Sequence, residues 1–282
     1  MPPPQPDICP STTALRVARQ RALHQIREEG RLFSDPFAIR VLDKTAETLV
    51  FSEQECAKAR LRHFVAARQR IAEDALAKAV RHGMRQTVIL GAGLDTFGLR
   101  NPFAPLGLRV FEVDAPQMQA WKRAQLHKQA LLVPASLMYA PVNFETDTLG
   151  QRLEESGFDP TQPAFFFWLG VIPYLTRSAI TATLEFMGKV PHANVVFDYN
   201  EPVSNYTGQD RENTLAREQA VAALGEPWLS RFQPEDMASL LRRSGFSHIQ
   251  DRDRYDLAAY FGNATPRPTP RPASAHILHA WR

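Results

Sequence analysis

Apolar residues in the first 80 positions recur at helical spacing. The first set is three or four residues apart, at Ala14, Val17, Ala18, Ala22 and Ile26. This spacing predicts an amphipathic helix, which Thr12 or Thr13 would cap. Ser34-Asp35-Pro36 predicts a second helix start, because proline suits the first helical turn. A third helix is expected over 52–82, ending at Gly83.

Beyond residue 86, short apolar runs alternate with helical patterns. The apolar runs lie at 87–90, 108–113, 137–144, 163–171 and 194–197. The helical patterns lie at 117–132, 149–156, 177–187 and 234–244, and two further strands are expected at 248–255 and 276–281. Such alternation is typical of a parallel sheet with helices on both faces. The sequence therefore predicts an α/β fold with about seven mostly parallel strands and an N-terminal helical layer.

Proline is concentrated at the two ends of the chain. Of the 22 prolines, several lie in residues 2–10, where we expect a disordered or extended arm, and others in the segment TPRPTPRPAS at 265–274. That second segment is open to two interpretations: a ligand for an SH3-like domain, or a stiff connection between strands. The strand-like run that follows it favours the connection.

Composition excludes several classes of protein. The 282 residues carry 33 Lys and Arg against 30 Asp and Glu, a balance that argues against a dedicated nucleic-acid binder. Cys9 and Cys56 are too few for a disulfide scaffold and form no C-x-x-C pair. The histidines show no metal-ligand spacing, so no metal site is predicted. Neither a secretory signal nor a membrane-spanning apolar run is evident, and we expect a cytoplasmic protein with no membrane partner.

A glycine-containing loop follows the first predicted strand. It reads Gly91-Ala92-Gly93-Leu94-Asp95-Thr96, and the next strand ends about twenty residues later at Glu112 or Asp114. Glycines at such a turn let a ligand approach the backbone, and a carboxylate at the following strand end can accept both hydroxyls of a ribose. The spacing predicts a site for a nucleoside-containing cofactor, although a turn that binds no ligand has the same appearance.

The loop favours S-adenosylmethionine over a dinucleotide. Thr96 occupies the position where the dinucleotide pattern G-x-G-x-x-G has its third glycine, and no P-loop string occurs in the chain. The carboxylate of Asp95 would repel a pyrophosphate but suits a sulfonium or an amino group.

These residues resemble the leucine carboxyl methyltransferase family of class I S-adenosylmethionine-dependent methyltransferases, including its bacterial O-methyltransferase branch. VILGAGLDTFGLR and VFEVDAP carry the resemblance. Further matches are TALRVARQRALHQ, FSDPFAIRVL, VAARQRIAEDAL, FFFWLGVIPYLT, FDYNEP, RFQPEDMASLLRRSGF and HILHAWR. The resemblance implies a Rossmann-like single domain with a helical cap over 1–82, a cofactor-binding core over 83–200, a lid over 201–232, and a final helix and strands over 233–282.

The resemblance also implies roles for individual residues. Asp114 matches the ribose-binding carboxylate, with Glu112 as runner-up, and Arg68 matches an arginine that binds the carboxylate of the cofactor. The complete set of expected cofactor-binding residues is Arg68, Gly91, Ala92, Gly93, Asp95, Glu112, Asp114, Asn143, Phe144 and Leu169.

The chain departs from the family pattern at two of these positions. Asn143 stands where the family often has Asp, and its side-chain oxygen can still accept a hydrogen bond from an adenine amino group. Leu169 precedes Gly170 where the family often has Glu, which removes a carboxylate near the cofactor.

The expected reaction is methyl transfer to a carboxylate or hydroxyl of a small or medium acceptor. A carboxylate acceptor needs no base, whereas a hydroxyl acceptor benefits from one. The candidate bases are His24, Tyr174, Asp198 and Tyr199. The expected catalytic residues are Tyr174 and Arg21, for which a packed aromatic and a surface arginine are the ordinary alternatives. An NAD-linked oxidoreductase and a non-catalytic binding protein with the same fold remain alternative functions.

Overall fold

The N-terminal segment of the computed structural model is helical, as predicted. The structure describes residues 11–42, 59–143 and 146–282. Helix α1 (Thr12–Arg27) is capped by the hydroxyl of Ser11, which accepts from the N–H of Ala14 at 3.2 Å, so the predicted cap at Thr12 or Thr13 is wrong by one residue. Helix α4 is described over Ala59–Arg81, and the earlier part of its predicted range lies outside the described residues.

The predicted helix start at 34–36 leads only to turns and the short 3-10 helix η1 (Arg40–Leu42) within the described residues. The side chain of Asp35 accepts from the N–H of Phe37 and from the hydroxyl of Thr96. This carboxylate therefore serves a tertiary contact as well as its own turn.

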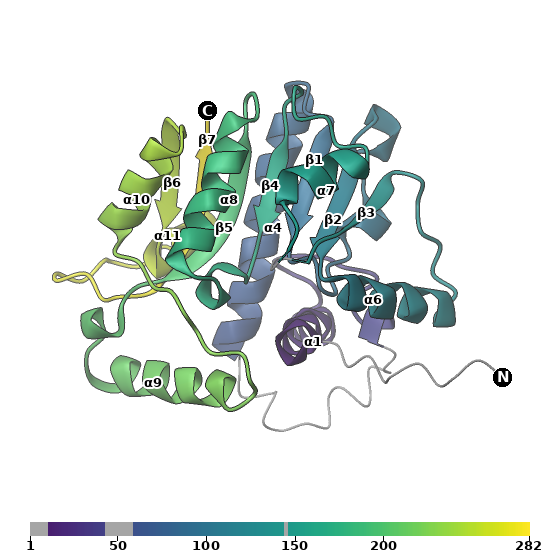
Figure 1. The fold of residues 1–282 in the computed structure, drawn as a ribbon. Helices are drawn as coiled ribbons and strands as arrows, with labels where there is room; N and C mark the ends of the chain where they lie inside the picture. The colour runs from purple at the N-terminus through teal and green to yellow at the C-terminus, as the bar shows by residue number, and fades with distance from the viewer. Residues whose placement is uncertain (1–10, 43–58, 144–145) are drawn as a thin grey trace. The chain divides into compact units, whose positions relative to one another are not determined.

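The sheet confirms the predicted fold class. Its strands are β1 (Gln86–Leu90), β2 (Arg109–Asp114), β3 (Leu137–Pro141), β4 (Phe165–Trp168), β5 (Asn194–Asn200), β6 (His248–Arg252) and β7 (Ala275–Trp281). They follow the order β3-β2-β1-β4-β5-β7-β6 (Figure 1). β1, β2 and β3 pair in parallel, as do β4 and β5, whereas β7 is antiparallel to β5 and β6.

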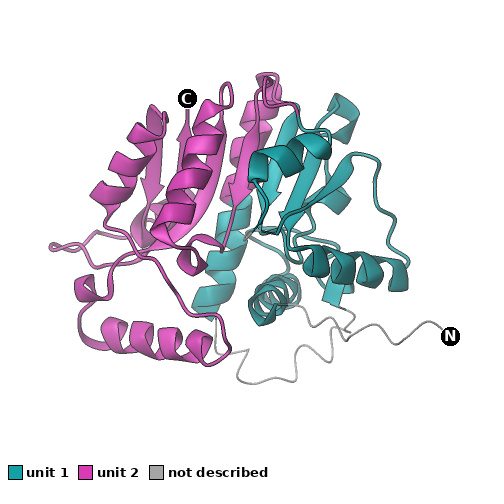
Figure 2. Ribbon diagram, viewed as in Figure 1, with its two compact units in different colours: residues 1–70, 85–158 teal, residues 71–84, 159–282 magenta. Residues whose placement is uncertain are grey.

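The chain divides into two compact units (Figure 2). The first unit, residues 1–70 and 85–158, contains β1 to β3 with α5 (Phe97–Arg100), the 3-10 helix η2 (Ala104–Leu106), α6 (Pro116–Lys128) and α7 (Leu149–Glu155). The second unit, residues 71–84 and 159–282, contains β4 to β7. Its helices are α8 (Arg177–Lys189), α9 (Gly208–Ala222), α10 (Pro234–Arg243) and α11 (Arg254–Tyr260), with the 3-10 helices η3 (Ile172–Tyr174) and η4 (Val203–Asn205).

The central strands are apolar because both of their faces are covered. Every residue of β1 and β4 is buried, including the run Phe165, Phe166, Phe167 and Trp168. The edge strand β6 is polar and half-exposed along its length. This contrast is expected when helices cover both faces of a parallel sheet and the edge remains open to solvent.

Several predicted boundaries are wrong, each for a local reason. The strand predicted to reach Val171 ends at Trp168, because Gly170 adopts a left-handed conformation and turns the chain. The strand predicted over 248–255 ends at Arg252, because Asp253 caps the unpredicted helix α11 through a reciprocal capping box.

Two other segments are shorter than expected. The strand predicted over 137–144 ends at Pro141, and the chain then turns as the N–H of Asn143 donates to Asp147 at 2.9 Å. The helix predicted over 117–132 spans Pro116–Lys128, and the left-handed conformation of Ala130 ends its path. The short helix α5 was not predicted. Among the described residues, no helix is both long and apolar enough to cross a bilayer.

Candidate cofactor site and active site

The loop after β1 is shaped by its two glycines. Gly91 and Gly93 have φ angles of 61° and 45°, a conformation that a side chain would disfavour. Between them, the N–H of Ala92 donates to the carbonyl of Val113 at 3.0 Å, which ties the loop to the end of β2. The carboxylate of Asp95 then accepts from the N–H of Phe97, the first residue of helix α5, at 2.7 Å. The predicted glycine loop is therefore preformed by its own backbone.

Asp114 orients the glycine loop from the carboxyl end of β2. Its Oδ2 accepts from the N–H of Gly93 at 2.6 Å, and its Oδ1 accepts from the N–H of Ala115 at 2.7 Å. Burial raises the pKa of Asp114, and these two hydrogen bonds act in the opposite direction. The side chain is only partly buried, so a carboxylate of fixed orientation lies at the edge where β2 ends.

Glu112 occupies a different environment two residues earlier. Its side chain is fully buried, and its Oε2 lies 2.7 Å from the ammonium of Lys122 on α6, which is also buried. Burial raises the pKa of Glu112, and Lys122 counteracts part of that rise. The same ammonium donates to the carbonyl of Asp95 at 2.6 Å. Glu112 and Lys122 thus hold β2, α6 and the loop together. Asp114 is the partly exposed carboxylate at this strand end.

Helix α1 packs directly on the loop. A Cβ atom added at Gly93 would lie 3.2 Å from the Cβ of Ala14, so the helix and the loop are in close approach. The guanidinium of Arg21 donates to the carbonyl of Leu94 and lies 3.6 Å from the carboxylate of Asp95. Arg21 is 4% exposed. Arg21 therefore joins α1 to the loop from a buried position.

A second carboxylate, that of Asp35, also pairs with Arg21. Asp35 lies 3.4 Å from the guanidinium of Arg21 and accepts from the hydroxyl of Thr96 at 2.6 Å. Arg100 on α5 lies 3.8 Å from the other carboxylate oxygen. Thr96, the residue that departs from the dinucleotide pattern, therefore has a defined role in binding the N-terminal segment to the loop.

The remaining predicted residues of the first unit have less defined surroundings. Arg68 is buried on α4, and Asn143 is exposed in the turn after β3. Asp114 pairs in register with Pro141, so Asn143 follows at the same edge of the sheet. Phe144 lies outside the described residues.

Leu169 and Tyr174 belong to the second unit. Leu169 directly follows β4, and the next residue, Gly170, donates its N–H to the carboxylate of Asp198 at 2.6 Å. Tyr174 ends η3 and is partly buried. The carbonyl of Pro173 accepts from the N–H groups of Leu229 and Ser230, so the segment after α9 is attached beside Tyr174.

Two of the candidate bases are held in structural hydrogen bonds. The Nε2 of His24 accepts from the N–H of Leu32 at 3.3 Å, and its Nδ1 lies 3.2 Å from Glu28. Burial lowers the pKa of His24 despite that carboxylate. Tyr199 donates its hydroxyl proton to Asp251 at 2.5 Å, and burial raises its pKa well above the usual range. Neither group is suited to accept a proton from a substrate.

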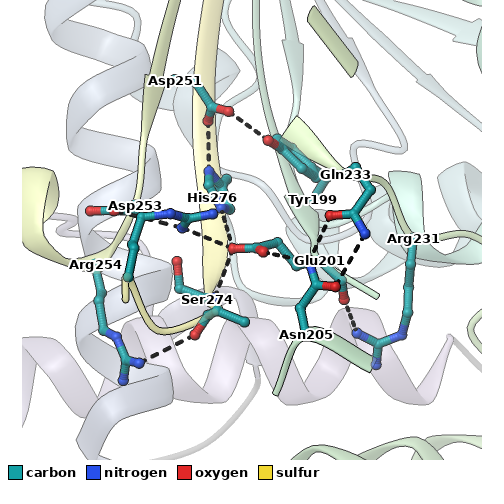
Figure 3. A network of polar contacts seen from close by, with 12 residues as sticks. Tyr199, Glu201, Asn205, Arg231, Gln233, Asp251, Asp253, Arg254, Ser274 and His276 are labelled. Carbon is teal, nitrogen blue, oxygen red and sulfur yellow. Dashed lines mark hydrogen bonds and ion pairs between the residues drawn. The ribbon is translucent and has the colours of Figure 1, made fainter. Parts of the chain in front are cut away.

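A buried polar network connects β5, β6 and β7 in the second unit (Figure 3). The ring of His276 lies between two carboxylates, with Nδ1 2.9 Å from Asp251 and Nε2 2.9 Å from Glu201. Glu201 also accepts from the side chain of Asn205 at 2.9 Å and from the N–H of Ser274 at 3.1 Å. The network therefore joins the carboxyl end of β5 to the two antiparallel strands.

The charged groups of this network stabilise one another in their ionised forms. Burial disfavours the charged ring of His276, but its hydrogen bonds to Asp251 and Glu201 outweigh burial and raise its pKa to about 9. Burial likewise opposes ionisation of Glu201, but the hydrogen bond from His276 and those from its other partners lower its pKa to about 2. At neutral pH the network thus contains a histidinium ion between two carboxylates.

Sequence reasoning missed Lys122 and the His276 network. Lys122 lies ten residues after Glu112 on a helix of mixed polarity, and nothing in that spacing indicates a buried ion pair. His276 is the first residue of the strand predicted over 276–281, and the strand pattern gives it no partner. Its partners are 25 and 75 residues away in the chain, so no local pattern could reveal them.

The comparisons with known proteins agree with this geometry. A glycine loop after β1 and a carboxylate after β2 define the class of α/β proteins that bind nucleoside-containing ligands. The family model described as "Leucine carboxyl methyltransferase" matches residues 14–188. The chain belongs to this family, and its class is that of the S-adenosyl-L-methionine-dependent methyltransferases.

Individual relatives support the assignment. "Putative S-adenosyl-L-methionine-dependent methyltransferase YktD" from Bacillus subtilis is 34% identical over 203 residues, which are 70% of this chain and 66% of the relative. A protein of the same description from Frankia alni is 31% identical over 278 residues, covering 96% of this chain and 93% of the relative. The crystal structure of a "putative methyltransferase" from Thermobifida fusca has a TM-score of 0.56 at 15% identity, covering all of this chain and 98% of that one, which supports the fold.

The Lys122 ion pair predicts a large and specific loss of stability. Lys122→Met should lower the free energy of unfolding by about 3–5 kcal/mol, because it leaves the carboxylate of Glu112 buried without its partner. Lys128→Met, at the exposed end of the same helix, serves as the control and should change stability little. Denaturant unfolding of both variants measures the difference. Equal losses would contradict the structural role of the pair, and Glu112→Gln combined with Lys122→Met should recover part of the stability.

The His276 network predicts a loss of stability at alkaline pH. A histidine whose folded pKa is raised from 6.5 to about 9 contributes fully below pH 6.5, and its contribution disappears as the pH rises through 9. The shift corresponds to about 3 kcal/mol. Thermal unfolding between pH 6 and 10 should show this decline, and His276→Gln should remove it. His192→Gln, at an exposed position of the same unit, is the control; an unchanged alkaline decline in His276→Gln would refute the assignment.

Proposed function

We propose that the protein is an O-methyltransferase that transfers the methyl group of S-adenosylmethionine to a carboxylate or hydroxyl of a small or medium acceptor. The observation that carries this proposal is the oriented, partly exposed carboxylate of Asp114 beside the backbone of Gly93. A carboxylate of this kind can accept hydrogen bonds from both hydroxyls of a ribose. Family membership supports the cofactor.

The residues around the loop are compatible with the charge of the proposed cofactor. Asp95 and Asp114 place two carboxylates at the loop, and these would repel a pyrophosphate but favour a sulfonium. Backbone groups at Gly91 and Gly93 would contact the methionyl part, and Ala92 lies between them. Arg68 would bind the cofactor carboxylate. Together with the relatives, this charge pattern favours S-adenosylmethionine over NAD.

Further contacts are proposed at the ends of β3 and β4. Asn143 would accept a hydrogen bond from the adenine amino group, whereas the predicted cofactor-binding residue Phe144 lies outside the described residues. Leu169 would supply an apolar contact where the family often has a carboxylate. The ammonium of Lys122 joins Glu112 to the carbonyl of Asp95 in the loop. In this proposal the buried Glu112 supports the loop, and the ribose binds to Asp114.

Bound S-adenosylmethionine would supply an activated methyl group for an in-line displacement. The protein then has to position the acceptor and exclude water. Arg21 contributes by holding α1 on the glycine loop, which makes it a positioning residue in this proposal. Tyr174 remains the proposed residue on the acceptor side, because it lies just beyond β4 in a segment that other chain elements hold in place.

The segment 201–232 is proposed to act as a lid over the acceptor. It contains α9 and returns to η3, where the hydroxyl of Ser230 donates to the carbonyl of Ile172 at 2.8 Å. Arg231 binds Glu218 on α9 at 2.6 Å and donates to the carbonyl of Glu201 at 2.6 Å. One arginine thus joins the two ends of the segment, and its release would allow the segment to open.

Loss of the Asp114 carboxylate should weaken cofactor binding. Asp114→Asn should reduce the affinity for S-adenosylhomocysteine by about 10- to 100-fold, because an amide is a weaker acceptor for ribose hydroxyls and cannot accept from both Gly93 and Ala115. Isothermal titration calorimetry measures the change, and a melting curve separates it from unfolding. Glu154→Gln, an exposed acid on α7, should bind normally. Unchanged affinity in Asp114→Asn would exclude this carboxylate as the ribose ligand.

The acceptor class can be determined from release of S-adenosylhomocysteine with a panel of carboxylic acids, phenols and alcohols, with the product identified by mass spectrometry. A carboxylate acceptor should give rates nearly independent of pH above its own pKa, because it needs no base. A hydroxyl acceptor should give rates that rise with pH and fall in Tyr174→Phe. Methylation only at nitrogen or carbon would refute O-methylation, and cofactor binding without turnover of any acceptor would favour the non-catalytic alternative.

A further inference from the structure

The second unit contains a cavity that the proposed methyl transfer does not use. Its volume is about 570 Å³, within the range of small-molecule sites. The walls come from the C-terminal half of α4, the strands β6 and β7, and Tyr260 at the end of α11. Asn194, the first residue of β5, lies at one side. The cavity is therefore at the amino end of β5, whereas the loop with Gly170 and Tyr174 follows the carboxyl end of β4.

Cationic side chains predominate in this cavity. Lys78, Arg252 and Arg282 line it, against the single side-chain carboxylate of Asp74. Asp74 already accepts a hydrogen bond from the hydroxyl of Tyr260 at 2.6 Å. Among the described lining residues, Lys78 and Arg252 thus outnumber the one acidic side chain, Asp74, and this excess of positive charge favours an anion.

The cations themselves lack acidic partners in the part of the chain that the structure describes. The ammonium of Lys78 makes no ion pair there. Arg252 donates to the side-chain oxygen of Gln250 at 2.8 Å, and its Nη1 is buried with no hydrogen-bond acceptor. Arg282 donates to the carbonyl of Gly188 at 2.5 Å. The hydrogen-bond acceptors of Arg252 and Arg282 are therefore neutral.

One wall of the cavity is aromatic. The rings of His279 and Trp281 lie 4.6 Å apart, and Tyr260 has the guanidinium of Arg252 over its face at 5.6 Å. The Nε2 of His279 lies 3.2 Å from the side-chain oxygen of Asn194, so this nitrogen carries the proton. Burial, followed by the nearby Arg252 and Lys78, lowers the pKa of His279 to about 3, and the ring is neutral. The aromatic rings of Tyr260, His279 and Trp281 therefore lie beside the cations.

We propose that this cavity binds a small planar organic anion, an aromatic ring that carries a carboxylate or a phosphate. The ring would pack against Trp281 and the apolar side chains of Ile71 and Ala75, while Lys78 and Arg252 would pair with the anionic group. A neutral ring would leave the cations unpaired, and a compact inorganic anion would leave the aromatic wall uncovered. The site is independent of the proposed methyl transfer.

Calorimetric titration with a matched set of probes tests the proposal. The probes are 1-naphthoate, 1-naphthyl phosphate and the neutral 1-naphthalenemethanol, each titrated with and without saturating S-adenosylhomocysteine. At least one anion should bind saturably in both conditions, and the neutral alcohol should bind about tenfold more weakly. The tighter of the two anions identifies the preferred anionic group.

Two lysine variants locate the binding site. Lys78→Gln should weaken anion binding about fivefold, since it removes one partly solvated charge contact. Lys189→Gln, an exposed lysine of the same unit outside the cavity, should bind as the unaltered protein does. The proposal is overturned if neither anion binds saturably, if S-adenosylhomocysteine displaces the anion, or if the two variants weaken binding equally. Melting curves of both variants confirm that each is folded.

Discussion

The candidate cofactor site depends on the two contacts that the buried ammonium of Lys122 makes. It joins helix α6 to the carboxylate of Glu112 in β2 and to the backbone carbonyl of Asp95 in the glycine loop. A buried ion must have partners, because an unpaired charge in the interior is strongly unfavourable. Because Lys122 needs both of its partners, the loop, the strand and the helix are held in one arrangement. Asp114 can then orient the loop from the side that remains partly exposed.

The two neighbouring acids of β2 show how environment divides similar residues between roles. Glu112 points into the packing of the first unit and is neutralised by Lys122, whereas Asp114 is held by two backbone N–H groups at the end of the strand. Alternation of side chains cannot separate them, because residues two apart lie on the same face of a strand. The two acids differ in their distance from the strand end, and only Glu112 pairs with Lys122 of α6.

Buried charge has a similar organising effect in both units. In the first, Arg21 and Asp35 attach the N-terminal helix to the loop; in the second, His276 joins three strands through two carboxylates. These networks lie close to segments that a methyltransferase would use, the glycine loop and the chain after β5. Within the described residues, Lys78, Arg252 and Arg282 of the cavity make no ion pair, which distinguishes the cavity from both networks and makes it a candidate binding site.

The sequence by itself determined the α/β class, the order of most strands and helices, and the glycine loop with its acid at 112 or 114. These features follow from local periodicity and from residue types that few other positions tolerate, such as glycines with positive φ. Only the tertiary structure showed that Glu112 is buried against Lys122 whereas Asp114 stays partly exposed, and only it gave Arg21 and His276 their partners. Those partners are distant in the chain, and a pairing between distant residues leaves no trace in local spacing, since it arises when packing brings the two charges out of water together.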